Sequence, residues 1–180
     1  MQLRGSVRLL REVAETASDA EWTSRAFPGA NLIGFTVWHG ARTIDWGVNF
    51  VLRHALELVD SAEWSDVNVE DGYFGAGAGR ETADRVAHQV PRARLVAYLN
   101  ELEAQTQAWL GSLPSSELET TTDLRERQAE KPEYLAPAVW SEIEDLDGIP
   151  AWQFLSRPCI SHIRVHYGEV TSQLEALRSA

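Results

Sequence analysis

The stretch Ser161-His-Ile-Arg-Val-His-Tyr-Gly-Glu-Val170 places two histidines, His162 and His166, one helical turn apart. Residues four apart on a helix leave the same face, so both imidazoles can reach a single metal ion. On a helical projection that starts at His162, both histidines fall inside an apolar arc, near its edge. Glu169 projects just beyond that edge, beside His162. The stretch predicts a long helix whose buried face carries two candidate metal ligands.

A second long helix, expected from Asn31 to about Val59, supplies a third imidazole, that of His39. At about 100° per residue, four apolar side chains lie within about 40° of His39: Leu32, Phe35, Trp46 and Phe50. One flank gathers Arg42, Asp45 and Asn49 together with Trp38, and the face opposite His39 is apolar again. A helix that is apolar on most sides is either well buried or covered by a partner chain.

Several of the remaining segments also show helical periodicity, and no segment has the alternation of a strand. Long helices are expected at 4–19, 91–112 and from Pro150 or Pro158 to about Arg178, with short helices at 82–89, 123–129 and 138–146. Four long helices joined by two long connections predict an all-α fold, a four-helix bundle that forms a single domain over residues 1–180.

Two connecting segments are candidates for closing over a binding pocket. The segment Asp71-Gly-Tyr-Phe-Gly-Ala-Gly-Ala-Gly79 has the spacing of a phosphate-binding loop, but no strand precedes it and no Gly-Lys-Ser/Thr follows. It is therefore expected to be a flexible crossover loop or lid. The irregular segment 114–149 is long for a small domain, and such connectors often close over a binding site.

Composition narrows the class of partner. The net charge is −11, and Lys131 is the only lysine, so no basic patch exists for nucleic acid or an anionic membrane surface. No window approaches 18 apolar residues, and the first residues do not resemble a signal peptide. The single cysteine, Cys159, cannot form an internal disulfide. These features predict a cytoplasmic protein with a small-molecule substrate.

The three histidines can be interpreted as a metal site or as separate core and surface residues. A neutral imidazole buried among apolar side chains needs partners for both ring nitrogens. A divalent ion would satisfy one nitrogen on each of His39, His162 and His166, and would keep a position free for water or substrate. His54 lies about four turns from His39, too far to share the ion, and His88 lies in a polar segment.

Two neighbouring residues have alternative roles. Cys159 could join a Cys-x-x-His-x-x-x-His ligand set, or it could pack as a small apolar thiol. Glu169 could orient a ligating histidine, act as a catalytic proton shuttle or remain solvated. The chain lacks Gly-x-Ser-x-Gly and His-Glu-x-x-His, which disfavours a serine hydrolase and a zincin protease.

The pattern resembles the DinB-like family of bacterial four-helix bundles. The resemblance rests on His39 within Val37-Trp-His-Gly40 and on His162-Ile-Arg-Val-His-Tyr-Gly-Glu169. It implies an up-down-down-up bundle, a divalent ion held by the three histidines, and a homodimer. Imidazole ligands suit zinc and nickel equally. Related bundles include mycothiol-dependent maleylpyruvate isomerases, which use a Glu-x-x-x-His pair where this chain has His162 and His166.

Two classes of function follow from a metal in the bundle. In the first, a metal-dependent enzyme activates water, as a hydrolase, or a low-molecular-weight thiol, as a transferase or isomerase, with Glu169 as proton shuttle. In the second, the metal stabilises a non-catalytic stress-response module, and the Trp38 flank serves dimerisation or partner binding. A third interpretation is a metal-free bundle that binds a small apolar ligand.

Overall fold

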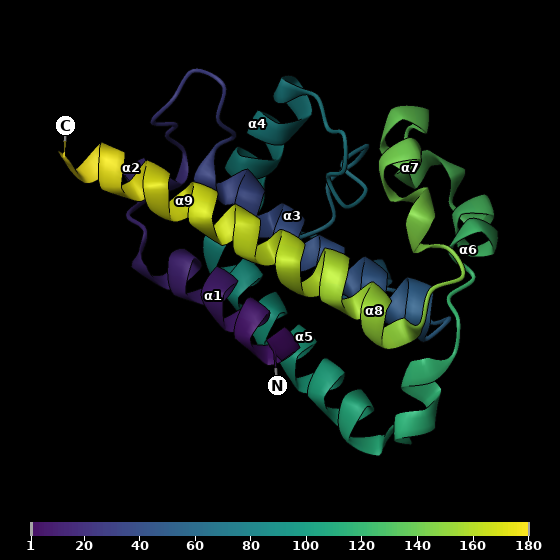
Figure 1. Cartoon of the computed structure of the whole chain (residues 1–180). Helices are drawn as coiled ribbons and strands as arrows, with labels where there is room; N and C mark the ends of the chain where they lie inside the picture. The colour runs from purple at the N-terminus through teal and green to yellow at the C-terminus, as the bar shows by residue number, and fades with distance from the viewer. Residues whose placement is uncertain (1, 180) are drawn as a thin grey trace.

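The computed structural model describes residues 2–179, which form helices and connecting turns (Figure 1). The α-helices are α1 (Gln2–Thr16), α2 (Asp19–Trp22), α3 (Ile33–Asp45), α4 (Arg80–Gln89), α5 (Arg92–Ser112), α6 (Leu124–Glu130), α7 (Pro137–Ile143), α8 (Ala151–Ser156) and α9 (His162–Ser179). Two π-helical segments, η1 (Trp46–Leu52) and η7 (Arg157–Ser161), continue α3 and join α8 to α9. Short 3-10 turns are η2 (Leu58–Asp60), η3 (Ala62–Trp64), η4 (Ser115–Glu119), η5 (Pro132–Tyr134) and η6 (Glu144–Leu146). Residues 2–179 contain no strand, so the all-α prediction is confirmed.

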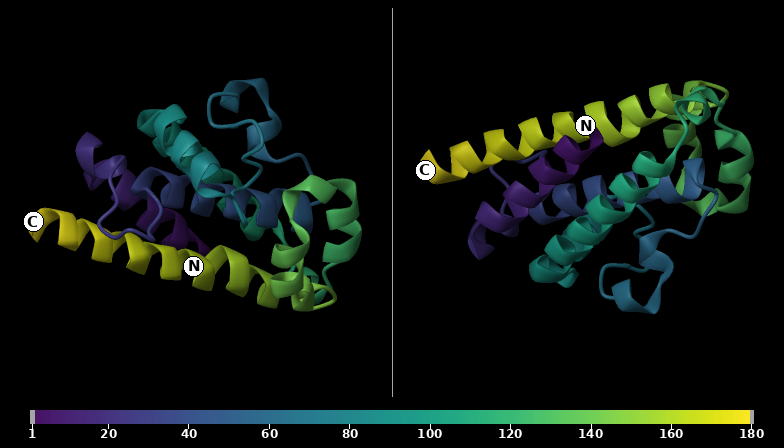
Figure 2. Two further views of the ribbon diagram at one scale, coloured as in Figure 1. Left: turned by 90° about the horizontal axis from the view of Figure 1, so that it is seen from above. Right: turned by 90° about the horizontal axis from the view of Figure 1, so that it is seen from below.

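Helix α3 lies at the centre of a helical bundle. It packs against α1, α4, α5 and α9, and α1 also contacts α5 and α9. Figure 2 shows α1 and α5 on one side of α3 and the long α8–α9 rod alongside it. Every residue of α3 is buried, as expected for a helix that is apolar on most sides. The covering helices belong to the same chain, so α3 needs no partner chain for its burial.

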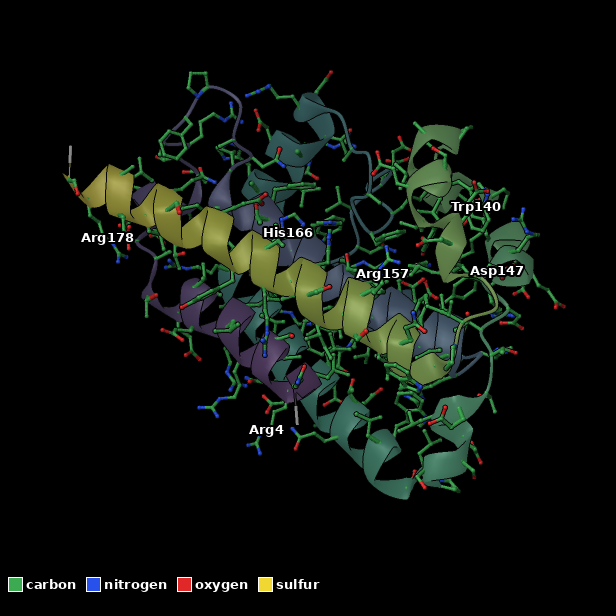
Figure 3. All side chains as sticks on the ribbon, in the orientation of Figure 1. Arg4, Trp140, Asp147, Arg157, His166 and Arg178 are labelled. Carbon is green, nitrogen blue, oxygen red and sulfur yellow. The ribbon has the colours of Figure 1, made fainter. Side chains whose placement is uncertain are left out.

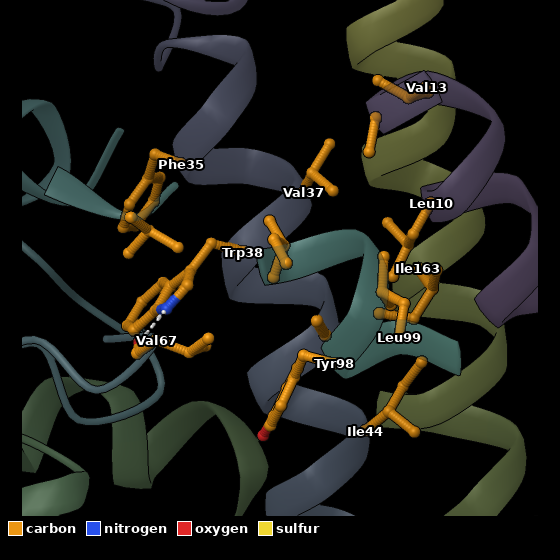
Figure 4. Close-up of a cluster of buried hydrophobic side chains, with 14 of the residues drawn as sticks. Leu10, Val13, Phe35, Val37, Trp38, Ile44, Val67, Tyr98, Leu99 and Ile163 are labelled. Carbon is orange, nitrogen blue, oxygen red and sulfur yellow. Dashed lines mark hydrogen bonds between the residues drawn. The ribbon is translucent and has the colours of Figure 1, made fainter. Parts of the chain in front are cut away.

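The main core forms where four helices bring apolar side chains together. Leu10 of α1, Ile44 of α3, Leu99 of α5 and Ile163 of α9 are all at most 2% exposed (Figure 4). Removing each such side chain from water stabilises the fold by about 1.5–3 kcal/mol. Apolar side chains from four segments far apart in the sequence therefore meet in one core.

The flank of α3 that carries Trp38 does not form a free surface. Trp38 is fully buried, and its indole N–H donates to the carbonyl of Val67 at 2.8 Å (Figure 4). Residues 57–74 fold back over this flank. The interpretation of Trp38 as part of a dimerisation surface is therefore wrong, because the chain's own connector covers it.

The second helix is shorter than expected. It begins at Ile33 with Leu32 as N-cap, instead of Asn31, and its π-helical continuation ends at Leu52, not near Val59. His54 then adopts a left-handed backbone with φ 51°, which reverses the chain. The reversal is held by the Asp45 carboxylate, which accepts from the backbone amides of Leu58 at 3.0 Å and Val59 at 3.3 Å.

The last helical rod begins at Ala151, with Pro150 as its N-cap, and continues through Pro158 into α9 (Figure 1). Proline lacks the N–H that an α-helix needs in its interior, and the π-helical turn η7 absorbs that loss. The two π segments cross closely: a Cβ on Gly47 of η1 would lie 2.8 Å from the sulfur of Cys159 in η7. Glycine is required there because any side chain would push the two segments apart.

The connector 114–149 contains α6 and α7 at the positions expected for short helices. It covers a second, smaller core of aromatic and aliphatic side chains at the end of α3: Trp46, Phe50, Val51, Phe74, Leu124, Tyr134, Leu135, Leu146 and Phe154. This second core fixes the connector against the bundle. In the described residues, none of the helices combines the length and the apolar character that crossing a bilayer requires.

Candidate metal centre

Three imidazoles meet where α3 passes α9. The Nε2 atom of His162 lies 3.1 Å from Nε2 of His39 and 3.0 Å from Nε2 of His166. One ring nitrogen from each residue lies within 4.8 Å of the others. His39 is buried, while His162 and His166 are partly exposed. The structure thus brings together the three histidines that the sequence singled out.

In His39 and His166, the hydrogen-bond partner of Nδ1, on the side of the ring away from the cluster, determines which nitrogen carries the proton. His39 Nδ1 lies 2.6 Å from the carbonyl oxygen of Phe74, and His166 Nδ1 lies 2.7 Å from a carboxylate oxygen of Glu169. The carbonyl oxygen and the ionised carboxylate only accept, so each Nδ1 donates, and in the neutral ring Nε2 then keeps its lone pair. His162 Nε2 can donate to only one of its two neighbours. The cluster therefore has more converging lone pairs than protons, which is the arrangement that a cation satisfies.

Electrostatics favour the neutral form of His39 and His162. Burial, together with the neighbouring His166 and His162, lowers the pKa of His39 to about 3. Burial also lowers the pKa of His162 to about 4, with His166 adding to the effect. A neutral imidazole is the form that binds a divalent ion, so at pH 7 no proton has to leave these two rings first.

The spacing of the nitrogens suits direct coordination. Zinc–imidazole bonds of about 2.0–2.1 Å place two ligand nitrogens about 3.3 Å apart at a tetrahedral angle and about 2.9 Å apart at a right angle. The separations of 3.0 and 3.1 Å around His162 fall between these values. The remaining pair, His39 and His166, lies within the 4.8 Å that encloses all three ligand atoms.

The histidines open into a cavity of about 580 Å³, a size typical of small-molecule sites. Most of the lining is apolar and includes Trp46, Phe74 and, from α7, Val139 and Ile143. The Trp46 and Phe74 rings stack with centroids 4.7 Å apart. Arg157, which precedes His166 along the α8–α9 rod (Figure 3), also lines the cavity, and its guanidinium pairs with Asp145 at 2.6 Å.

Both segments expected to cover a pocket contribute to this cavity. Gly75 and Gly77 of the glycine-rich loop line it, as do Val139 and Ile143 of the connector. A Cβ on Gly77 would lie 2.6 Å from the side chain of Val139, so the loop and α7 form one continuous wall. Opening and closing of this wall stays a prediction.

The other candidate residues lie outside the cluster. Cys159 is fully buried, and burial raises the pKa of its thiol to about 12, so it packs as an apolar side chain. His54 lies 3.3 Å from a carboxylate oxygen of Asp123, away from the three histidines. His88 is exposed on α4. The expectation that neither His54 nor His88 joins His39 agrees with the structure.

Glu169 contacts a different histidine from the one that the projection placed beside it. Its carboxylate meets Nδ1 of His166, three residues earlier, instead of His162. Projection angles ignore the tilt of side chains toward the helix N-terminus, which brings residues three and four apart into contact. The projection gave only the direction of Glu169 around the helix, and the structure adds that its hydrogen bond is with His166.

The sequence missed a buried charged cluster next to His39. Arg42 is fully buried, and its Nη1 atom lies 3.0 Å from carboxylate oxygens of both Asp45 and Glu57. Its Nε and Nη2 atoms donate to the carbonyl of Tyr73 at 3.2 and 3.1 Å. An Arg and an Asp three apart on an otherwise apolar helix were the available signal. No local pattern identified Glu57 or Tyr73 as their partners.

Fold and site together define a helical-bundle protein with a candidate three-histidine metal centre in its core. The chain belongs to the DinB superfamily, whose sequence model matches residues 2–142. The resemblance found in the sequence is thus confirmed at the level of the superfamily. The match includes His39 but ends before His162 and His166, so the grouping of all three rests on the structure. No curated protein and no solved structure matched the chain.

Proposed function

We propose that this chain is a metal-dependent enzyme in which His39, His162 and His166 hold a divalent ion, zinc or nickel. The observation that carries the proposal is the convergence of three imidazoles beside an open cavity, with His162 Nε2 lying 3.1 Å from His39 Nε2 and 3.0 Å from His166 Nε2. Such an ion supplies Lewis acidity that lowers the pKa of water or of a thiol. The two reaction classes that fit are hydrolysis and transfer or isomerisation dependent on a low-molecular-weight thiol.

The cavity supports a small-molecule substrate with an apolar body. Trp46, Phe74 and Ile143 offer apolar contact, and the one arginine among the lining residues, Arg157, is already paired with an aspartate. A phosphate or polycarboxylate would find little compensation there. These residues would bind and orient the substrate and exclude water from it.

Glu169 supports the centre through His166. Its carboxylate accepts a hydrogen bond from Nδ1 at 2.7 Å, which holds the ring with Nε2 toward the other two histidines. This position behind the ring favours an orienting role over proton transfer to substrate. Glu169 is also exposed, on the side of the ring away from the cluster.

The test is elemental analysis of protein purified without a polyhistidine tag. Wild-type protein expressed in a medium with ample metal is expected to contain about one zinc or nickel ion per chain. His166→Ala removes one of three ligands and is expected to lose most of the ion while its circular dichroism stays helical. His88→Ala, which removes an exposed histidine of α4, is the matched control and should retain the ion.

Wild-type protein that contains no stoichiometric metal under these conditions would contradict the proposal. A metal-stabilised, non-catalytic module is the second candidate, and it predicts the same metal content without turnover. The open cavity beside the histidines favours the enzyme, since a purely structural ion is normally enclosed by four protein ligands.

Two further features belong to the proposal. The packing of α1, α3, α5 and α9 supports the up-down-down-up four-helix topology with two long connections that the family resemblance implies. The homodimer rests on that resemblance alone. We place the protein in the cytoplasm, without nucleic acid or membrane partners, on the strength of its acidity and its single buried cysteine.

A further inference from the structure

We propose that Arg42 is a positioning residue for the metal centre: its guanidinium fixes the backbone at Tyr73 and Phe74, and so holds the carbonyl that orients His39. The inference rests on the proposed metal site for its consequence. The contacts that carry it, however, are independent of any ion.

The guanidinium of Arg42 is fully occupied on two sides. On one edge, Nε and Nη2 both donate to the Tyr73 carbonyl, at 3.2 and 3.1 Å. On the other, Nη1 donates to Asp45 at 3.0 Å and to the Tyr98 hydroxyl at 3.3 Å. Since guanidinium is planar and rigid, fixing one edge fixes the direction of the other. Arg42 therefore connects α3 rigidly to the glycine-rich loop, residues 71–79.

The charged side chains around Arg42 are paired with one another, although most of them lie deep in the bundle. Arg42 and Lys131 oppose Asp45 and Glu57, with Lys131 Nζ 2.8 Å from a carboxylate oxygen of Glu57. Arg42 and Asp45 are fully buried, and Glu57 is 2% exposed. A buried cluster of this kind is often no more stable than an apolar replacement of similar volume. Its position beside His39 thus points to a role in orientation.

The loop segment that Arg42 contacts has a strained backbone conformation. Tyr73 has φ 48°, a left-handed conformation that costs a bulky residue on the order of 1–3 kcal/mol. The next residue, Phe74, provides the carbonyl that accepts from His39 Nδ1 at 2.6 Å. Two successive carbonyls are therefore directed at α3, one toward Arg42 and one toward His39, which lie one helical turn apart. Loss of the first contact lets the second one move.

The consequence concerns the proton on His39. While Phe74 accepts from Nδ1, the lone pair of Nε2 faces His162. If the loop relaxes, the ring can place its proton on Nε2 or rotate, and a ligand nitrogen is lost. Disruption of a hydrogen-bond partner of a ligating histidine typically weakens metal binding by about 10–100-fold.

The variant Arg42→Lys tests this inference. Lysine keeps the buried positive charge for Asp45 and Glu57, but its single ammonium cannot also span to the Tyr73 carbonyl with two parallel hydrogen bonds. The matched control is Tyr98→Phe. It removes a hydroxyl that donates to Asp45 and accepts from Arg42 Nη1, while Arg42 keeps its hydrogen bonds to Asp45 and to the Tyr73 carbonyl.

Three measurements are made on both variants: the melting temperature of metal-free protein, zinc affinity by competition with a chromophoric chelator, and the His39 tautomer by nitrogen NMR without metal. Both variants are expected to have a lower melting temperature than the wild-type protein. Only Arg42→Lys should bind zinc about 10–100-fold more weakly and lose the Nδ1–H tautomer of His39. If Arg42→Lys keeps wild-type zinc affinity and tautomer, or if Tyr98→Phe loses both to the same extent, the inference is overturned.

If Arg42→Lys fails to fold, the double variant Arg42→Gln, Glu57→Gln removes an ion pair as a unit and leaves Lys131 its contact with Asp60. The same expectations and the same contradicting results apply to it. The failure of the proposed function is recognised separately, because it would show as absence of zinc binding by the wild-type chain. In that case the His39 tautomer of the metal-free variants still decides the role of Arg42.

Discussion

At the scale of single residues, the three candidate ligands differ in what holds them. His39 is oriented by a backbone carbonyl in a buried setting, and His166 by the exposed carboxylate of Glu169. A backbone acceptor cannot be removed by substitution, but the loop that carries it can be displaced. Gly75, directly after Phe74, is the residue through which such a displacement can be produced.

Gly75→Ala is expected to destabilise the protein by about 1–3 kcal/mol and to weaken metal binding. Gly75 has φ 91°, which alanine adopts only with strain. A Cβ there would also lie 2.9 Å from His39 Nδ1 and 3.1 Å from the Trp38 ring. Chemical denaturation gives the free energy of unfolding, and chelator competition gives the zinc affinity.

Gly168→Ala is the matched control for this substitution. Gly168 lies in α9 between His166 and Glu169, and no neighbouring atom lies within 4 Å of an added Cβ. Alanine in a helix interior stabilises by about 0.5–1 kcal/mol relative to glycine, so the control should gain stability and keep its zinc affinity. Equal effects of the two substitutions would contradict the steric role of Gly75.

At the scale of elements, the short helix α2 ties the loop before α3 to the end of α9. Glu21 of α2 accepts from the amide of Ser18 at 2.7 Å in a capping box, and it also accepts from Arg178 of α9 at 2.6 Å. The hydrogen bond from Arg178, followed by that from Ser18, lowers the pKa of Glu21 to about 2. One carboxylate thus caps one helix and anchors another.

Glu21→Gln is expected to lower the melting temperature at pH 7, and the difference from wild type should shrink in acid. The carboxyl has a pKa of about 2 when folded and 4.5 as its ordinary value. Its stabilisation is therefore fully present above pH 4.5 and disappears as the pH falls toward 2. Melting temperatures at pH 7, 5 and 3 check this, and Arg178→Leu should flatten the same pH dependence. A difference that stays constant from pH 7 to 3 would rule out this role.

At the scale of the whole molecule, the helical periodicity of the sequence predicted those features that depend on which face of a helix a residue occupies. His39, His162 and His166 lie on inward-facing positions of long helices, and a helical projection is sufficient to find such positions. The end of α3 could not be found in this way, because Asp45 captures amides 13 and 14 residues further on. The sequence could not predict that Arg42 contacts Tyr73 either, because Tyr73 lies in a loop that has no periodicity.

Metal binding should couple to the stability of the entire bundle, because the ligands join its central helix to its last one. An ion that binds only the folded chain stabilises it by about 2.7 kcal/mol at a hundredfold excess over its dissociation constant. For a chain of this size, that corresponds to a rise in melting temperature of roughly 5–10 °C. Differential scanning calorimetry with and without zinc measures the shift. His88→Ala should show the full shift and His166→Ala almost none, whereas an equal shift in both would mean that the ion binds away from α3 and α9.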